Sequence, residues 1–277
     1  MPEVVCMLAI SCECPRSAGF DAKTKNMKYK ALSLICLLMA LIAGPVTAEI
    51  VFKENFDNSP PYSDGGTLPL APGEIRFGQW HIVEEESIPR IVTSTEEALS
   101  QPRSLTIEGG TEGRTVVGLQ FGFSNAEATE TTDAVRVRLA VCAQPNSSAE
   151  VLLYGREAFL GYAQIVMNES GIGYARAWFD GAAGADRYPL SAGVWYVIEM
   201  NFPEIPNADS QYTFRVFEKD GTTQIGGDAS GRFYIPPNGN TSYKSLTLQS
   251  EKAGGIVRFD DISVETSPEA TASHLER

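Results

Sequence analysis

The segment GIGYARAWFDG, residues 171–181, gathers three side chains whose types suit sugar recognition. In a β-strand the side chains alternate between two faces, so Tyr174, Arg176 and Trp178 share one face, about 6.6 Å apart. Flat aromatic rings stack on the C–H face of a pyranose, and a guanidinium supplies paired hydrogen-bond donors. The spacing therefore predicts a binding row for successive sugars of an extended chain.

Partners for this row can come from neighbouring strand-like segments. Four further side chains of suitable chemistry are expected at its rim: Tyr154, Arg156, Tyr162 and Gln164. The other face of the segment carries Gly173, Ala175 and Ala177, whose small size fits a crowded interior between two sheets. A second interpretation stays open, in which the aromatic face is packed core and Arg176 extends its charged end to an edge.

The elements that must position these residues are short β-strands. Beyond residue 48, alternating segments rich in Val, Ile, Tyr, Phe and Thr are separated roughly every 8–12 residues by Gly, Asn, Asp and Pro. In DAVRVRLAV, positions 135, 137, 139 and 141 are apolar on one face, whereas Arg136 and Arg138 lie on the other. No long segment keeps the helical period of about 3.6 residues. The pattern predicts an all-β fold, a two-sheet antiparallel sandwich.

The N-terminal segment has the features of an export signal. Two lysines follow Met27, and an apolar run of 13 residues precedes small residues that end at Ala48. A membrane-spanning helix needs about 20 apolar residues, so cleavage after Ala48 is expected instead. We therefore expect a signal peptide over residues 27–48, a non-native upstream extension over 1–26, and a secreted protein, extracellular or periplasmic.

The charge and cysteine content of the chain beyond residue 48 limit the classes of partner that it can bind. Only Cys142 lies beyond residue 48, within the apolar segment VRLAVCA, so we expect a buried thiol and no internal disulfide. The same part of the chain has 17 basic and 32 acidic residues, a balance that repels nucleic acid and anionic membranes. The acidic surface also disfavours densely anionic glycans, and it suits neutral glycans or partners bridged by cations.

Three parts of the chain resemble one superfamily. The segment VFKENFD (51–57), the pair LSAGVWYVIEMNF and YTFRVFEKDG (190–202 and 212–221), and VRFDDISVE (257–265) carry the likeness. Together they resemble the concanavalin A-like lectin/glucanase jelly roll, especially the laminin-G-like domains of secreted bacterial proteins. The resemblance implies a jelly-roll domain over residues 49–265, followed by a disordered tail over 266–277. It also implies that the first and last strands lie together, which removes an open sheet edge.

The catalytic patterns of this superfamily are not found in the sequence. Its glucanases carry E-x-D-x-E or E-x-D-x-x-E, because a retaining glycosidase needs two carboxyl groups about 5–5.5 Å apart. Here VEEES offers Glu84 and Glu86 with no Asp between them. Its lyases carry Q-[IV]-H, whereas AQIVM places Val166 at the position of the histidine, and the two histidines are His81 and His274. Whether the protein is an enzyme is therefore uncertain, and the sequence favours no activity.

The resemblance also implies a structural calcium ion between the first and last strands. The matching residues are Asp57, after the first strand, and Asp260, in the last, with Glu54 as an alternative. Ca²⁺ binds six to eight oxygen ligands, and converging carboxylates repel one another unless a cation lies between them. In the alternative interpretation Asp57 opens a turn and Asp260 is a solvated strand residue.

These observations favour non-catalytic recognition of an extracellular polysaccharide or glycoprotein on the concave sheet. Two alternatives stay open: a polysaccharide lyase or glycoside hydrolase with another active site, and a structural or adhesive surface protein without a ligand site. Converging titratable groups with shifted pKa values would favour catalysis, and an aromatic-lined face without them would favour recognition.

Overall fold

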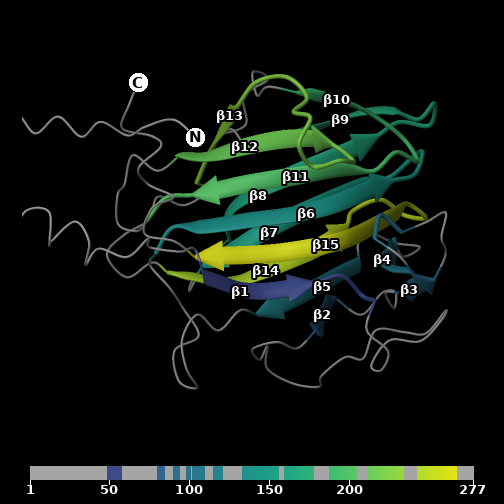
Figure 1. The fold of residues 1–277 in the computed structure, drawn as a ribbon. Coiled ribbons are helices and arrows are strands. Elements are labelled where there is room, and N and C mark those ends of the chain that lie inside the picture. Colours follow the sequence, from purple (N-terminus) through teal and green to yellow (C-terminus); the bar gives the residue numbers. More distant parts are fainter. Residues whose placement is uncertain are drawn as a thin grey trace, which may run out of the picture. The chain divides into compact units, whose positions relative to one another are not determined.

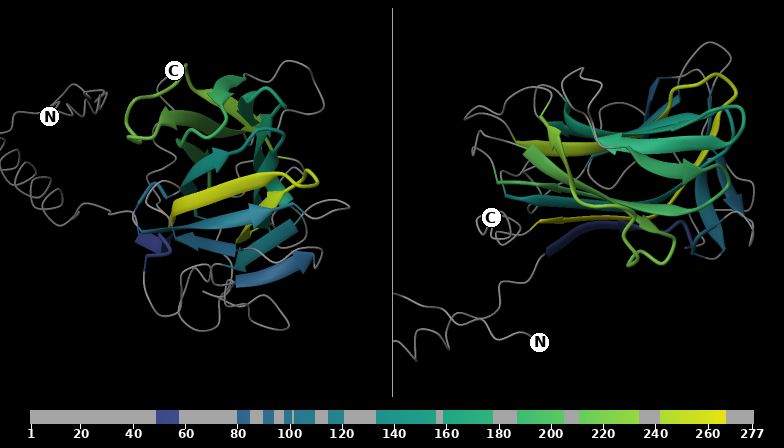
Figure 2. Two further views of the ribbon diagram at one scale, coloured as in Figure 1. Left: turned by 90° about the vertical axis from the view of Figure 1, so that its right-hand side faces the viewer. Right: turned by 90° about the horizontal axis from the view of Figure 1, so that it is seen from above.

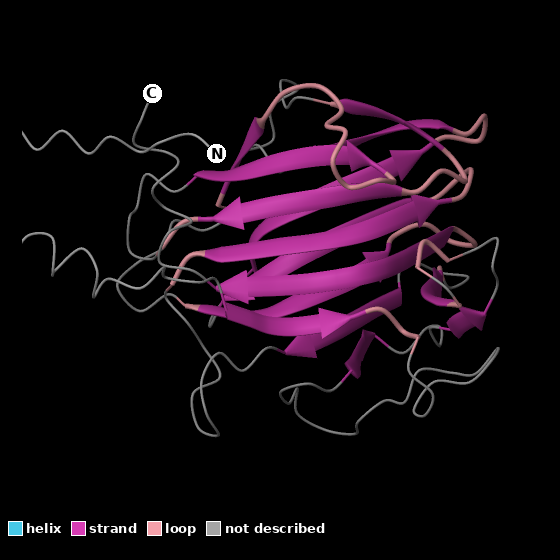
Figure 3. Ribbon diagram, in the orientation of Figure 1, coloured by secondary structure: helices cyan, strands magenta, loops and turns pink. Residues whose placement is uncertain are grey.

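Strands alone make up the regular structure of the described residues, in keeping with the alternating sequence (Figure 3). The computed structural model describes residues 49–57, 80–84, 90–93, 98–100, 102–109, 115–120, 133–155, 159–177, 187–204, 211–233 and 242–266. They belong to one unit, Thr47–Arg277. Among them, no helix is long and apolar enough to span a bilayer. The segments predicted as extension and signal peptide lie outside the described residues, and so does the predicted tail beyond Thr266.

One sheet has eight strands and brings the last strand beside the first. Its strands are β1 Glu49–Glu54, β3 Arg90–Thr93, β4 Arg103–Glu108, β6 Val135–Ala143, β11 Tyr196–Phe202, β12 Gln211–Glu218, β13 Ala229–Arg232 and β15 Ile256–Thr266. The order is β13-β12-β11-β6-β15-β4-β3, and β1 pairs with the second half of β15 (Figure 1). Lys53 lies opposite Ser263, which confirms that the first and last strands pair.

The other sheet has seven strands. They are β2 Trp80–Glu84, β5 Thr115–Gln120, β7 Ser148–Gly155, β8 Phe159–Met167, β9 Ile172–Ala177, β10 Tyr188–Ser191 and β14 Tyr243–Ser250. Their order is β10-β9-β8-β7-β14-β5-β2, and each neighbouring pair is antiparallel. The two sheets pack face to face around one core (Figure 2). The predicted fold class, an all-β antiparallel sandwich of jelly-roll type, is therefore confirmed.

The inward faces of the strands build the core as their alternation predicts. On β6 the four apolar positions 135, 137, 139 and 141 are buried, whereas Arg136 and Arg138 point outward and are partly exposed. On β12 Tyr212 and Phe214 are completely buried. Full burial of such a side chain contributes about 1.5–3 kcal/mol. Cys142 is 3% exposed, which confirms the expected buried thiol.

Tyr212, which belongs to an aromatic contact in this core, joins the two sheets by a hydrogen bond and thereby fixes β8. The rings of Phe202 and Tyr212 stack with centroids 4.7 Å apart, and the Tyr212 hydroxyl donates to the Tyr162 carbonyl oxygen at 2.6 Å. Two glycines leave room for these rings. A Cβ at Gly161 would lie 2.7 Å from Phe202 Cε1, and a Cβ at Gly231 would lie 2.0 Å from Tyr212 Cζ. The core thus sets which residues of β8 face outward.

Candidate functional site

Strand β9 presents the larger side chains of the GIGYARAWFDG segment to the outside. Ala175 and Ala177 are 0% and 2% exposed and belong to the core, whereas Tyr174 and Arg176 are half-buried and point away from it. Of the two interpretations left open by the sequence, packed core does not hold for these two residues. Trp178, which continues the segment, lies outside the described residues.

Arg176 begins a hydrogen-bonded row that crosses the outer face of the seven-stranded sheet. Its Nε and Nη2 donate to Gln164 Oε1 at 2.9 and 2.7 Å. Gln164 Nε2 donates to Glu150 Oε1 at 3.3 Å. From the far side, Gln249 Nε2 donates to Glu150 Oε2 at 2.5 Å and to Glu251 Oε1 at 3.5 Å. We call these five residues the polar row.

The strand register places the polar row in line. Arg176 on β9 lies opposite Gln164 on β8, Gln164 lies opposite Glu150 on β7, and Glu150 lies opposite Gln249 on β14. Both oxygens of Glu150 accept from amide groups, so the guanidinium and the two amides are oriented along the row. Side chains fixed in this way lose less conformational entropy when a ligand binds.

The middle of this outer face is shielded from solvent. Glu150 and Gln249 are 8% and 2% exposed, although they point away from the core. In the next register line, Tyr162 lies opposite Leu152, and Leu152 lies opposite Thr247; all three are buried yet lie outside the core cluster. Polar groups at low exposure form stronger hydrogen bonds than they would in open water.

The four residues predicted at the rim differ in where the structure places them. Gln164 is a central member of the polar row. Tyr154 is half-buried on the outer face, opposite Ser245 of β14. Tyr162 is on the same face but only 7% exposed, so its ring offers little surface to a ligand. Arg156 lies outside the described residues.

Two guanidinium groups lie close to the ring of Tyr174. Arg176 Cζ lies 5.8 Å from the ring centroid and Arg187 Cζ lies 4.5 Å from it. Contacts of this kind contribute about 0.5–1 kcal/mol at exposed sites. They hold the ring beside the end of the polar row, where an aromatic surface meets oriented donors.

Sequence reasoning missed Glu150, Gln249 and Glu251 in the polar row, and Arg187 beside it. Glu150 and Gln249 are 99 positions apart and are joined only by the pairing of β7 with β14. The available signal was weak: Glu150 lies between Ala149 and Val151, and Gln249 follows Leu248, each in a strand-like segment.

Asp260, predicted as a calcium ligand, is completely buried at a β-bulge in β15. Its Oδ2 accepts from the backbone N–H groups of Leu99 and Ser100, both at 2.9 Å. Its Oδ1 accepts from the Ser100 hydroxyl at 3.1 Å and from the Asp261 N–H at 2.8 Å. Burial raises the pKa of Asp260 to about 7, although the hydrogen bonds from Ser100 and Asp261 oppose the rise.

The other two predicted ligands, Asp57 and Glu54, lie just after β1 and at its end. Asp57 accepts from the Arg103 N–H through Oδ1 at 3.3 Å and from Asn55 Nδ2 through Oδ2 at 2.8 Å. Glu54 Oε1 accepts from the N–H groups of Asn55 and Phe56 at 3.0 and 2.8 Å. Among the described residues, no three His, Cys, Asp or Glu side chains come together as a metal site. The calcium site stays a prediction.

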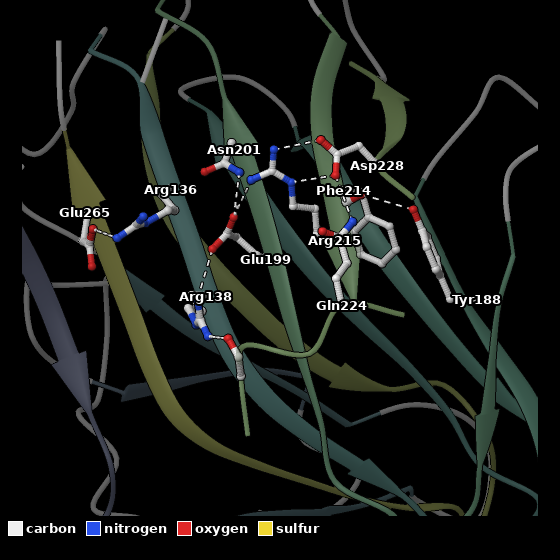
Figure 4. A network of polar contacts seen from close by, with 11 residues as sticks. Arg136, Arg138, Tyr188, Glu199, Asn201, Phe214, Arg215, Gln224, Asp228 and Glu265 are labelled. Atoms are coloured by element: carbon white, nitrogen blue, oxygen red, sulfur yellow. Dashed lines mark hydrogen bonds and ion pairs between the residues drawn. The ribbon is translucent and has the colours of Figure 1, made fainter. Parts of the chain in front are cut away.

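A second polar network covers the outer face of the eight-stranded sheet (Figure 4). Arg138 Nη1 lies 3.3 Å from Glu199 Oε2, and Arg215 Nη1 lies 3.2 Å from Glu199 Oε1. Arg215 also binds both oxygens of Asp228, at 2.9 and 2.8 Å. The hydrogen bond to Asp228 is the main reason why the pKa of Arg215 is raised. Opposite charges alternate in this network, so its members are matched to one another.

Comparisons with known proteins concern the fold. No protein-family model matches this sequence. No curated protein matches it either. Among solved structures, the alginate lyase of Aplysia kurodai, described as marine PL-14, is similar at 14% identity and a TM-score of 0.47, over 79% of this chain and all of that one.

Two further similar solved structures are a lyase and a sugar binding protein. The endo-β-1,4-glucuronan lyase of the fungus Trichoderma reesei is 11% identical, with a TM-score of 0.45, over 80% of this chain and 99% of that one. A putative sugar binding protein from Bacteroides thetaiotaomicron is 12% identical, with a TM-score of 0.41, over 79% of this chain and all of that one. At these identities the likeness does not extend to activity.

Proposed function

We propose that the outer face of the seven-stranded sheet binds an extended saccharide chain, without catalysis. The observation that carries this proposal is the polar row, which crosses four neighbouring strands and in which the buried Glu150 and Gln249 fix the half-buried side chains of Gln164 and Arg176. Sugar hydroxyls both donate and accept hydrogen bonds, so a row that offers planar donors and acceptors at fixed positions suits them.

The aromatic residues support the same assignment. Tyr174 adjoins the polar row at one end, and Tyr154 lies on the same face of β7. Half-buried rings of this kind provide apolar surface for the C–H face of a sugar and keep their hydroxyl groups for hydrogen bonds. Trp178 stays a predicted member of the site.

The partner we propose is an extracellular polysaccharide or glycoprotein, met by a secreted protein of the concanavalin A-like superfamily. This assignment rests on the predicted signal peptide and on the sequence segments that resemble that superfamily. The alternative, a lyase or hydrolase on the same face, differs in one measurable respect, because turnover shortens the chain whereas binding leaves it intact.

The test is a glycan array and a pull-down with insoluble polysaccharides, using the purified protein, a Tyr174→Ala variant and a Gln164→Ala variant. We expect binding that weakens about tenfold or more in each variant, because each removes a stacking surface or a central link of the polar row. Asn201→Ala, which alters the outer face of the other sheet, is the matched control and should bind as the unaltered protein does.

Two outcomes would count against the proposal. New reducing ends or unsaturated products from a bound polysaccharide would make the protein an enzyme. If the folded protein binds no glycan at all, the structural or adhesive alternative replaces it.

A further inference from the structure

Arg187 and Arg176 bring two positive charges together beside the polar row. In the pairing of β10 with β9, Tyr188 lies opposite Ala175, so Arg187, one residue before β10, adjoins the position of Arg176. Both guanidinium groups lie within 6 Å of the centroid of the same ring, Tyr174. Like charges at facing positions of neighbouring strands destabilise a sheet.

In the described part of the chain, neither arginine forms an ion pair with a carboxylate. Arg176 donates to the neutral amide of Gln164 and lies near the ring, and Arg187 contacts the ring alone. Acidic residues outnumber basic ones 35 to 22 in this protein, so unmatched neighbouring cations are unexpected on its surface.

Three arginines on the outer face of the other sheet show the usual arrangement (Figure 4). Arg136 pairs with Glu265, Arg138 pairs with Glu199, and Arg215 pairs with Asp228. These charges are matched within the protein. The pair beside Tyr174 differs from these three, because an anion from outside would find there two neighbouring cations that no carboxylate of the described residues has matched.

We propose that Arg176 and Arg187 bind a negatively charged substituent of the saccharide chain, a carboxylate or a sulfate ester. This inference rests on the proposed function and specifies its ligand. A guanidinium binds either oxyanion through two parallel N–H donors, and a bound anion also relieves the repulsion between the two arginines. Tyr174 lies next to both cations, where it can contact the sugar ring that carries the charged group.

The negative net charge of the protein affects which charge density of a saccharide chain is bound best. A densely anionic polymer meets repulsion from the acidic surface around the two arginines, whereas an isolated charge meets the local attraction and little of that repulsion. We therefore expect the tightest binding to chains in which charged sugars are separated by neutral ones.

The test uses ligands that share a backbone and differ in charge. Pectins of full, intermediate and low methyl esterification vary the carboxylates, and dextran with sparsely sulfated dextran varies the sulfate esters. Binding of the purified protein is measured by affinity electrophoresis at low and at moderate salt. We expect the intermediate pectin or the sparsely sulfated dextran to bind at least tenfold more tightly than its neutral counterpart, and salt to reduce that difference.

Arg187→Gln is the decisive variant, because this exposed residue can change without disturbing the core. It should lose the preference for the charged ligand, whereas Arg187→Lys should retain part of it. Arg215→Gln, on the other sheet, is the control for a general change of charge. A preference among the pectins identifies the bound group as a carboxylate, and a preference among the dextrans identifies it as a sulfate ester.

The failure of this inference differs from the failure of the proposed function. Equal binding of charged and neutral chains, or a preference that survives Arg187→Gln, overturns the anion site and leaves saccharide binding in place. If the protein binds neutral glycans of the array but binds neither the pectins nor the dextrans, the anion site is likewise overturned and saccharide binding is left in place. If the folded protein binds no glycan in either experiment, both proposals fail.

Discussion

Asp260 is a charged residue type held in the interior of the sandwich, where an unpaired carboxylate would be costly. Four donors offset part of this cost, because both carboxylate oxygens accept two hydrogen bonds each. Three of those donors belong to Leu99 and Ser100, so the carboxylate holds residues 98–100 against the β15 bulge. The next residue, Asp261, has φ of 46°, a left-handed value that marks the bulge.

Replacing Asp260 with Asn should destabilise the fold by about 2–4 kcal/mol. The amide keeps one acceptor oxygen and turns the other into a donor that faces backbone N–H groups, which leaves buried donors unpaired. Urea unfolding measures the loss. Asp261→Gly is the matched control, and it should be nearly neutral because glycine adopts a positive φ without strain. Equal stability of Asp260→Asn and the unaltered protein would contradict this role.

The same residue predicts how stability changes with pH. The pKa of Asp260 is raised to about 7 in the folded protein, compared with 3.8 as the ordinary value, so the folded state binds the extra proton between these limits. Stability should therefore fall as the pH rises from about 4 to about 7. Urea midpoints at several pH values test this, and Asp260→Asn should flatten the profile. A profile that is unchanged in the variant assigns the dependence to other groups.

At the scale of elements, the packing of β12 and β13 against β8 depends on the absence of side chains at particular positions. Gly231 lies opposite Tyr212 in the pairing of β12 with β13, and the Tyr212 ring occupies the space that a Cβ would need. Tyr212 cannot move freely, because its ring stacks on Phe202 and its hydroxyl binds the carbonyl of Tyr162.

Gly231→Ala should lower the free energy of unfolding by about 2–3 kcal/mol, through overpacking of this aromatic contact. Gly227→Ala is the control, since a Cβ at Gly227 meets no atom within 4 Å. Thermal or urea unfolding of the two variants checks the difference. If both variants lose the same stability, the effect belongs to the glycine backbone and not to the space beside Tyr212.

At the scale of the whole molecule, the last strand of the described residues returns to the first. β1 pairs with the second half of β15, while the first half of β15 pairs with β4. The change of partner occurs next to Asp260, and Asp57 after β1 binds Arg103 at the start of β4. Both acidic residues therefore act at the corner where the first and last strands meet.

The predicted calcium ion would bind at this corner. Binding of the ion would change the stability of the protein measurably. If Asp57 and Asp260 hold Ca²⁺, calcium at about a hundred times its Kd adds about 2.7 kcal/mol to the stability, and Asp57→Asn removes most of that gain. Melting curves after EDTA treatment and after addition of excess Ca²⁺ provide the measurement. A Tm that is the same in both conditions would reject the site, and hydrogen bonds alone would then explain both carboxylates.

The strands and the direction of most of their faces could be predicted from the sequence. The apolar positions of β6 and β12, and the small residues Ala175 and Ala177, are buried as their alternation indicates. Alternation is a local property, because each side chain direction follows from the extended backbone of its own strand. Gln164 and Arg176 were likewise selected from their own segments, where residue type and spacing are visible.

The tertiary structure alone decided which segments became neighbours. Nothing in the local sequence joins Glu150 to Gln249, or sets Arg187 beside Arg176, because those contacts depend on the order of strands within the sheet. That order is set by how strands of both sheets pack around one core, which is a property of the whole chain. The sequence thus determined an all-β sandwich and two members of its polar row, and the strand order completed the row and placed two unmatched cations at its end.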